Sequence, residues 1–387
     1  MADNVRVVCI VGTRPEAIKM APVVRDLRAR SGFEVFLLST GQHREMLAQV
    51  LDAFELKPDY DLEIMTERQS LNGILARALP GLDQVYQEIQ PDLVLTQGDT
   101  STAFIAGLVA FNRRITVGHI EAGLRSFDKW QPFPEEVNRR LLSVVADFNF
   151  APTTTAQNYL LQEKVVESAI FVTGNTVTDA LLTMLKPDYQ FKNPVLAKTV
   201  AGLTRGQRLI LVTAHRRENW GEPLRQVCQA IKELLASGLP VQFVWPVHLN
   251  PTVRNLVYQE LNGVAGVALI DPLEYPDLAN LISQVDLIWT DSGGIQEEAP
   301  TLGKPILVLR QVTERPEGVA AGTASLVGTD TAQLVVQTQL LLTNETSYQQ
   351  MATAYNPYGD GQAAWRIGEY LSWYYGLTPN KPDPFGK

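Results

Sequence analysis

Cysteine is nearly absent from this chain of 387 residues. Cys9 and Cys228 are the only two, and they lie far apart, each within an apolar run. Two such residues build neither a disulfide framework nor a zinc site, and they suit a reducing compartment. The chain has only four histidines, which are His43, His119, His215 and His248. Because none of them shows the i, i+2 or i, i+4 spacing of metal ligands, we expect no metal.

Long apolar runs and basic stripes are missing as well. No stretch approaches the ~20 residues that span a bilayer, and the N-terminus lacks the basic start and apolar region of a signal peptide. We therefore expect a soluble, cytoplasmic protein with no membrane partner. Lys and Arg number 33 against 42 Asp and Glu, a net charge of −9. Without a basic stripe to displace counterions we expect no nucleic-acid partner, whereas a small anionic ligand is compatible with this charge.

The common nucleotide-binding fingerprints are also lacking. No GxxxxGK[ST] string occurs, and Gly303-Lys304 is followed by Pro305. The one GxGxxA string, at 359–364, follows no predicted strand. We therefore expect neither a P-loop kinase or ATPase nor an NAD-dependent oxidoreductase, and no cofactor.

What the sequence does have is a regular alternation of apolar runs and helical patterns. The run at 5–11 is continuously apolar, which is typical of a strand buried on both faces of a parallel sheet. Strands are predicted at 5–11, 34–38, 92–96, 115–120, 148–151, 170–173, 208–213, 241–245, 267–270, 287–290 and 305–309. Helices are predicted at 15–30, 44–54, 71–89, 100–112, 135–145, 155–164, 223–237, 251–261, 278–284, 294–302 and 363–375. This alternation indicates the α/β class with open, doubly wound sheets.

The pattern restarts after a polar stretch at 186–204, which divides the chain into two Rossmann-like halves. We predict one domain at 1–180, a second at 181–362, and a C-terminal helix and tail at 363–387 that pack across the domain junction. Two halves that face one another leave a cleft at the carboxyl ends of their strands, where open α/β sheets bind ligands.

The first motif, Gly12-Thr13-Arg14-Pro15-Glu16, follows the first strand and opens the first helix. Backbone N–H groups at such a helix start attract an anion, and Arg14 and Lys19 add positive charge. The alternative is an ordinary turn with exposed basic residues.

Three acidic residues follow strands or begin a helix in the first half. Asp99 would project into the cleft, although it could instead be a helix N-cap. Glu121 lies between apolar and small residues and needs a partner, for which Arg125 is a structural candidate. Glu135 begins a helix, where the dipole alone favours an acid. These three carboxylates come from three different junctions and would meet in one cleft. Their meeting favours a catalytic role over the structural alternatives.

The second half has its own motifs at strand ends. His215 precedes Arg216 and Arg217, so it is either a neutral hydrogen bonder or acid for a phosphate, or an ordinary surface histidine. The segment 291–298, DSGGIQEE, places two glycines at a helix start, which is typical of a phosphate cradle. Glu298, one turn further, would reach a ribose. The alternative is a capped helix with glycine for packing.

Taken together, these motifs resemble the non-hydrolysing UDP-N-acetylglucosamine 2-epimerases over nearly the whole chain. The strings that carry the resemblance are GTRPEAIKMAP (12–22), TGQHREML (40–47), QGDTSTA (97–103), HIEAGLRS (119–126), PEEVNRR (134–140), TGNTVTDAL (173–181), AHRREN (214–219), TDSGGIQEEAP (290–300), LGKPILVLR (302–310) and TERPEG (313–318). The resemblance implies a glycosyltransferase-B-like fold, a homodimer, and reversible conversion of UDP-GlcNAc to UDP-ManNAc for surface polysaccharides. UDP would be eliminated and re-added through a glycal-like intermediate.

The resemblance also assigns roles by motif. The catalytic positions are Asp99, Glu121, Glu135 and His215. The UDP-binding positions are Arg14, Lys19, Ser292, Gly293, Gly294, Glu298 and Arg315. A second UDP-GlcNAc, acting as an activator, would use Gln42, His43, Arg68 and His248. We expect Asp99 and Glu135 to transfer the protons, Glu121 to stabilise charge on the ring, and His215 to hold the departing phosphate.

Two rival functions remain at this stage. A glycosyltransferase of the same fold would also bind a UDP-sugar but needs an acceptor, and the three carboxylates suit it less well. A non-catalytic UDP-sugar sensor would only bind.

Overall fold

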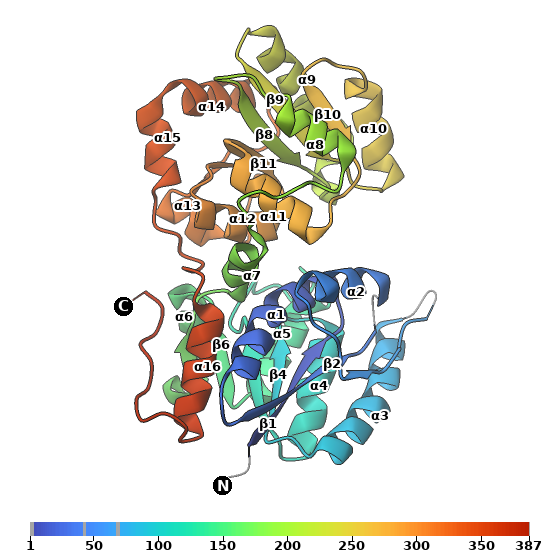
Figure 1. Ribbon diagram of the computed structural model, residues 1–387, viewed down its shortest axis with the longest axis vertical. Coiled ribbons are helices and arrows are strands. Elements are labelled where there is room, and N and C mark those ends of the chain that lie inside the picture. Colours follow the sequence, from blue (N-terminus) through green and yellow to red (C-terminus); the bar gives the residue numbers. More distant parts are fainter. Residues whose placement is uncertain (1–3, 42–43, 67–69, 387) are drawn as a thin grey trace. The chain divides into compact units, whose positions relative to one another are not determined.

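The computed structural model describes residues 4–41, 44–66 and 70–386 (Figure 1). The chain forms two compact units, one made of Met1–Thr183 with Tyr358–Lys387 and the other of Met184–Pro357. The first unit thus ends three residues later than the predicted boundary at 180, and the chain returns to it at Tyr358 rather than at 363. The C-terminal helix, which we expected to pack across the domain junction, is part of the first unit.

The first unit contains a seven-stranded parallel sheet in the order β3-β2-β1-β4-β5-β6-β7. Its strands are β1 (Val5–Val11), β2 (Phe33–Ser39), β3 (Tyr60–Asp61), β4 (Leu93–Gln97), β5 (Thr116–Ile120), β6 (Phe148–Ala151) and β7 (Ile170–Val172). Its helices are α1 (Arg14–Ala29), α2 (Arg44–Ala53), α3 (Leu71–Ile89), α4 (Ser101–Asn112), α5 (Glu135–Val145), α6 (Thr154–Gln162), α7 (Thr176–Met184, ending at the unit boundary), α16 (Ala363–Tyr374) and the 3₁₀ turn η1 (Glu167–Ala169).

The central strands of this sheet are buried, as their apolar runs predict. Val7 to Val11 of β1 and all of β4 lie inside, with Val8 in register between Phe36 and Val94. Because all seven strands are parallel, the residues that follow them gather at one edge of the sheet. This carboxyl edge carries the first unit's candidate residues.

The helix α16 packs directly on α1 (Figure 1). A Cβ built on Gly368 would lie 2.0 Å from Asp26 Oδ2, so a larger residue there would have to displace that side chain. Arg30, which directly follows α1, completes the contact, donating to Glu369 at 2.5 Å. This close packing explains why the C-terminal helix belongs to the first unit.

The second unit contains a six-stranded parallel sheet in the order β10-β9-β8-β11-β12-β13. Its strands are β8 (Arg208–Thr213), β9 (Val241–Pro246), β10 (Val267–Ile270), β11 (Leu287–Thr290), β12 (Ile306–Val308) and β13 (Ala324–Leu326). Its helices are α8 (Pro194–Ala201), α9 (Glu222–Ala236), α10 (Pro251–Leu261), α11 (Tyr275–Gln284), α12 (Gly293–Glu298), α13 (Pro316–Ala321), α14 (Thr331–Thr343), α15 (Glu345–Ala352) and the 3₁₀ turns η2 (Arg217–Asn219) and η3 (Ala299–Leu302). The second carboxyl edge therefore carries the residues after β8 and β11.

The predicted strands and helices all exist, but the prediction missed the strands β3 and β13 and the helices α7, α8, α13, α14 and α15, of which α14 has 13 residues. The strands β3 and β13 have two and three residues, too few for a periodic pattern. The helix α8 lies in the stretch that we interpreted as a polar linker. Its start is fixed by Asn193, whose side chain accepts from the N–H groups of Val195 and Leu196. Among the residues that the structure describes, no helix is both long and apolar enough to span a membrane.

Candidate functional site

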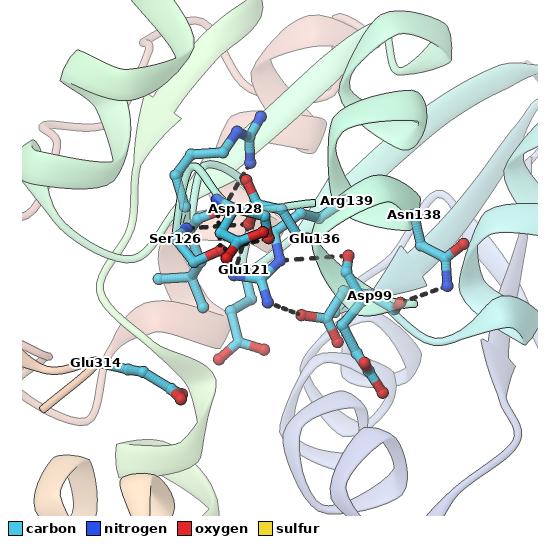
Figure 2. Close-up of polar contacts among 12 residues, drawn as sticks. Asp99, Glu121, Ser126, Asp128, Glu136, Asn138, Arg139 and Glu314 are labelled. Carbon is cyan, nitrogen blue, oxygen red and sulfur yellow. Dashed lines mark hydrogen bonds and ion pairs between the residues drawn. The ribbon is translucent and has the colours of Figure 1, made fainter. Parts of the chain in front are cut away.

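Asp99 lies two residues beyond β4, in a turn that Gly98 opens with a φ of 75°. Arg139 of α5 approaches one carboxylate oxygen at 3.0 Å, and Asn138 donates to the Asp99 backbone carbonyl at 3.0 Å (Figure 2). The side chain remains 27% exposed, so a ligand can reach it. Two neighbours on one helix therefore hold this carboxylate in place.

The pKa of Asp99 is raised above its ordinary value. Burial is the main cause, and the positive charge of Arg139 opposes it. The negative charges of Glu121 and Glu135 raise the pKa further. The structure thus brings Glu121 and Glu135 close enough to influence the ionisation of Asp99.

Glu121 follows β5 directly and has a positive φ of 64°, which is unusual for a residue other than glycine. Its buried carboxylate accepts hydrogen bonds from Lys19 and Gln97, and from Asn175 at 3.0 Å. Arg125, the structural partner that we considered from the sequence, instead binds Glu163 at 2.7 Å. The charge partner of Glu121 is therefore Lys19, a residue that the resemblance assigned to UDP.

The turn after β1 differs from the predicted anion site. The N–H groups of Gly12 and Thr13 donate to the carboxylate of Glu16 at 2.8 and 2.7 Å, and Thr100 donates to its other oxygen. A buried carboxylate of the chain thus occupies these two donors, as in a capping box. Arg14, half-buried in the first turn of α1, remains a candidate for an anionic ligand.

The two glutamates at the start of α5 have different surroundings. Glu136 is fully buried, and it accepts from the backbone N–H groups of Ser126 at 3.0 Å and Phe127 at 3.3 Å (Figure 2). It therefore holds the loop before α5. Glu135 is half-buried, and its charge acts on Asp99. Glu135, rather than Glu136, is therefore the candidate for a catalytic role.

In the second unit, Asp291 holds the segment that carries His215. Its buried Oδ2 accepts from the backbone N–H groups of His215 and Arg216 and from the side chain of Asn219, each at 2.9 Å. Its Oδ1 lies 3.3 Å from Nδ1 of His215. Burial lowers the pKa of His215, Asp291 opposes this, and Arg216 adds to it. The ring is fixed on one side and is 38% exposed.

The glycines at the start of α12 are not required by the unit's own packing. Neither Gly293 nor Gly294 has a positive φ. A Cβ on Gly293 would come no closer than 3.8 Å to Arg315, and one on Gly294 no closer than 3.9 Å to Ser292 or Glu298. A methyl group at either position would meet only ordinary van der Waals contacts, so the fold itself does not require glycine there, and this fits the close approach of a ligand.

The remaining UDP-binding candidates are held by neighbours within the second unit. Glu298 is buried and accepts from the Tyr275 hydroxyl at 2.8 Å, and Arg315 donates to Glu297. The structure therefore gathers Ser292, both glycines, Glu298 and Arg315 around one helix start.

Only one of the four predicted activator residues lies in the described part of the chain. Gln42, His43 and Arg68 lie outside the described residues. The ring of His248 stacks on that of His215, with centroids 5.4 Å apart. A predicted activator residue thus touches a predicted catalytic residue.

Several residues that shape the site escaped the sequence analysis. Arg139, Asn175 and Asp291 all lie within the quoted motifs, but the motifs do not reveal which carboxylate or ring each one contacts. A signal for Arg139 was present, because it follows Glu135 by one helical turn. In the described ranges, no group of three or more His, Cys, Asp or Glu is arranged to hold a metal ion.

Comparison with known proteins gives consistent similarities. The family model described as UDP-N-acetylglucosamine 2-epimerase matches residues 25–372. The UDP-N-acetylglucosamine 2-epimerase of Bacillus subtilis strain 168 is 49% identical over 99% of this chain and 99% of its own. A solved UDP-N-acetylglucosamine 2-epimerase structure has a TM-score of 0.91 and 46% identity, covering 100% of both chains. The Neisseria meningitidis enzyme bound to UDP-GlcNAc has a TM-score of 0.84 and 46% identity, covering 95% of this chain and 99% of that one.

These similarities confirm the predicted fold class, which is α/β with two Rossmann-like halves of the glycosyltransferase-B-like type. The family match covers far more than half of the chain, and the relatives align from end to end. The chain therefore belongs to the UDP-N-acetylglucosamine 2-epimerase family.

Proposed function

We propose that this chain interconverts UDP-GlcNAc and UDP-ManNAc by inverting C2 of the sugar. The observation that carries the proposal is the set of three carboxylates, Asp99, Glu121 and Glu135, at the carboxyl edge of the first sheet. Family membership supports it, because the Bacillus subtilis relative is named for acting on this substrate and the Neisseria meningitidis relative binds it.

The reaction proceeds in two halves. A base removes the proton from C2, the electron pair forms a C1=C2 double bond, and the C1–O bond breaks as UDP leaves. UDP then adds back to C1 of the glycal-like intermediate while an acid delivers a proton to the opposite face of C2. This sequence requires one proton-transfer group on each face of the sugar.

We assign the two proton transfers to Asp99 and Glu135. A general base works best when its pKa is closer to the working pH than that of a free carboxylate. Burial raises the pKa of Asp99 in this direction, and Arg139 keeps the ionised form accessible. Glu135 is half-buried near this carboxylate and serves as the second group.

Glu121 has a different role in this proposal. Three donors, from Lys19, Gln97 and Asn175, fix its carboxylate, so it is suited to electrostatic stabilisation rather than to exchanging protons. It would stabilise positive charge that develops at C1 as the bond to UDP breaks.

His215 holds the departing phosphate. A bound pyrophosphate favours the protonated imidazole, in which Nδ1–H donates to Asp291 and Nε2–H to a phosphate oxygen. Because Asp291 anchors both the ring and the segment, the histidine needs little rearrangement.

UDP is held by the residues around the start of α12. The N–H groups beside Ser292, Gly293 and Gly294 would bind the pyrophosphate, with Arg315 of the same unit supplying positive charge. Glu298 would accept from the ribose hydroxyls. These assignments rest on the motif and on the presence of two glycines that the packing of the unit does not require.

For a second UDP-GlcNAc that acts as an activator, this proposal assigns Gln42, His43, Arg68 and His248. The stack of His248 on His215 gives it a direct route to the catalytic histidine. We further propose that the enzyme acts in the cytoplasm as a homodimer and supplies precursors for surface polysaccharides.

The experiment that tests the proposal uses purified protein, UDP-GlcNAc and deuterated water, with no acceptor. We expect UDP-ManNAc with deuterium at C2, and deuterium also in recovered UDP-GlcNAc as equilibrium approaches. Product without C2 deuterium would contradict proton exchange at C2. Binding without product would instead indicate a sensor, and product only after adding an acceptor would indicate a glycosyltransferase.

A further inference from the structure

Three polar side chains form a row across neighbouring strands inside the first unit. Thr96 of β4 is in register with His119 of β5, which is in register with Asn149 of β6. Register partners on parallel strands project to the same face of the sheet, so the three side chains lie side by side. All three residues are fully buried.

Apart from Nε2 of His119, the polar side-chain atoms of this row make no hydrogen bond to the residues that the structure describes. Thr96 Oγ1, His119 Nδ1 and both amide atoms of Asn149 have no hydrogen-bond partner among the described residues. Buried polar atoms in folded proteins are nearly always paired, with protein or with ordered water. Four such atoms in one row therefore indicate a ligand that both donates and accepts hydrogen bonds.

The spacing of the row fits water. The three side chains make no hydrogen bonds to one another, and because neighbouring strands lie about 4.8 Å apart, one water molecule can bridge two of them. A buried water typically makes about three hydrogen bonds, and the row offers enough partners for it. Val94 and Val117, two residues earlier on β4 and β5, pack into the core beneath α4 and α5. The row thus continues a face that helices cover.

His119 connects this row to the turn of Asp99. Its Nε2 lies 2.8 Å from the carbonyl oxygen of Gly98, and because a carbonyl only accepts, Nε2 must donate. Burial lowers the pKa of His119 to about 4, so the ring is neutral and Nδ1 is an acceptor. A donor on Nδ1 would hold the ring in this tautomer.

We propose that Thr96, His119 and Asn149 bind a buried cluster of ordered water, and that His119 is thereby a positioning residue for the Gly98–Asp99 turn. The water donates to Nδ1, the ring donates from Nε2 to Gly98, and the carboxylate of Asp99 is presented at a fixed angle. The second half of this inference rests on the proposed function, since it concerns the reaction in which Asp99 takes part.

The water itself is tested on the whole protein by crystallography. We expect density for ordered water within about 3 Å of His119 Nδ1 and of the Asn149 amide. The tautomer is tested by NMR on protein labelled with ¹⁵N-histidine, which has only four imidazoles. The His119 signals, assigned by their loss in His119→Gln, should report a neutral Nε2–H ring from pH 5 to 8. A row without water, or an Nδ1–H ring, overturns the proposal even if the enzyme is active.

The positioning role is tested with two apolar substitutions and a matched control. Thr96→Val and Asn149→Leu should each lower kcat about 10-fold or more and change KM for UDP-GlcNAc less than about twofold. The Nε2–H signal should weaken as well. In Thr338→Val, an equally buried threonine that accepts from Trp289 in the second unit, kcat should stay at the wild-type value.

Two outcomes would contradict the positioning role or the proposed function. If Asn149→Leu or Thr96→Val unfolds at higher temperature with an unchanged kcat, the row is only unfavourable packing and the positioning role is wrong. Should Asn149→Leu fail to fold, Thr96→Val has nearly the same shape and decides the question. If the wild-type protein does not epimerise UDP-GlcNAc, the proposed function fails, while the water and the tautomer are still decided by the crystal and the NMR signals.

Discussion

Lys19 and Glu121 are 102 positions apart in the chain and form an ion pair inside the first unit. Their side chains are only 14% and 6% exposed. A lysine in α1 thereby neutralises an acid at the end of β5, which explains how a carboxylate is tolerated at a buried, positive-φ position. The pair joins the motif at 12–22 to the motif at 119–126, which are far apart in the sequence.

The first prediction follows from the burial of this pair. Lys19→Met leaves a buried carboxylate without its cation and should lower the free energy of unfolding by on the order of 3 kcal/mol. The double variant Lys19→Met/Glu121→Gln should be less destabilised than the sum of the single variants, because no uncompensated charge remains. Chemical denaturation of all four proteins measures the coupling.

The control for this prediction is an exposed pair. Lys192 and Glu274 lie 2.7 Å apart with side chains 67% and 42% exposed, so Lys192→Met should change stability little. Strictly additive effects of the Lys19 and Glu121 substitutions would show that the buried pair contributes no net coupling.

The second prediction concerns the acid side of the pH–rate profile. Arg139 lowers the pKa of Asp99, so Arg139→Met should raise that pKa, and Asp99 would then lose its proton only at higher pH. If Asp99 is the base, the acid limb of kcat should move to higher pH. Rates measured between pH 5 and 9 give this shift.

Arg140 provides the matched comparison on the same helix. It pairs with Glu163 at 3.2 Å rather than with Asp99, and its side chain is half exposed. Arg140→Met should therefore leave the acid limb in place. An unmoved limb in Arg139→Met would mean that a group other than Asp99 controls it.

The third prediction concerns stability against pH at the start of α16. Asp179 is buried and accepts from the N–H groups of Ala363 and Ala364, and burial raises its pKa to about 6. Since the folded pKa is above the ordinary value of 3.8, the favourable contribution is complete below pH 3.8 and is lost as pH rises through about 6. The loss amounts to about 3 kcal/mol at most.

Asp179→Asn removes this titration. The melting temperature of the variant relative to wild type should therefore increase as pH is raised from 4.5 to 7.5. Asp360, whose pKa is lowered by a hydrogen bond from Arg366, should behave in the opposite way, and Asp360→Asn should differ most from wild type near neutral pH and least at low pH, where Asp360 is protonated. Parallel curves for Asp179→Asn and wild type would show that Asp179 does not titrate in this range.

The sequence predicted the strands well because their apolar runs end sharply. The predicted strand at 5–11 coincides with β1, since both of its faces are buried and polar or glycine residues flank it. The strand β13 was missed because only the first of its three residues is buried. Low burial accounts for β13, whereas α14 shows that an element of 13 residues can also be missed.

The sequence predicted a site residue's position only where the order of strands and helices determines that position. Asp99, Glu121 and His215 follow strands, and the carboxyl ends of parallel strands share an edge. Their partners were not predictable, because the contacts of Glu121 with Lys19 and of His215 with Asp291 depend on the spacing between distant elements. The turn after β1 gives a second example. The backbone N–H groups of Gly12 and Thr13, which we expected to bind an anion, donate to the carboxylate of Glu16 instead.

The last prediction separates ligand binding from packing at the start of α12. Gly294→Ala adds a methyl group that would come no closer than 3.9 Å to any protein atom, and the backbone has no positive φ to resist it. The melting temperature should therefore be unchanged or slightly higher. If the pyrophosphate of UDP lies against this glycine, the same methyl group should displace it and raise the Kd for UDP about 10-fold or more, measured by calorimetry.

Gly303 in the same unit gives the opposite pattern and serves as the control. Its φ is +62°, and a Cβ would lie 2.9 Å from the carbonyl oxygen of Ala352, so glycine there is required by the fold. Gly303→Ala should lower the melting temperature and leave the Kd for UDP unchanged. If Gly294→Ala binds UDP as tightly as wild type does, the nucleotide does not approach α12 at this glycine. The assignment of Ser292, Gly293 and Gly294 to the phosphates would then be wrong, even in an enzyme that still epimerises its substrate.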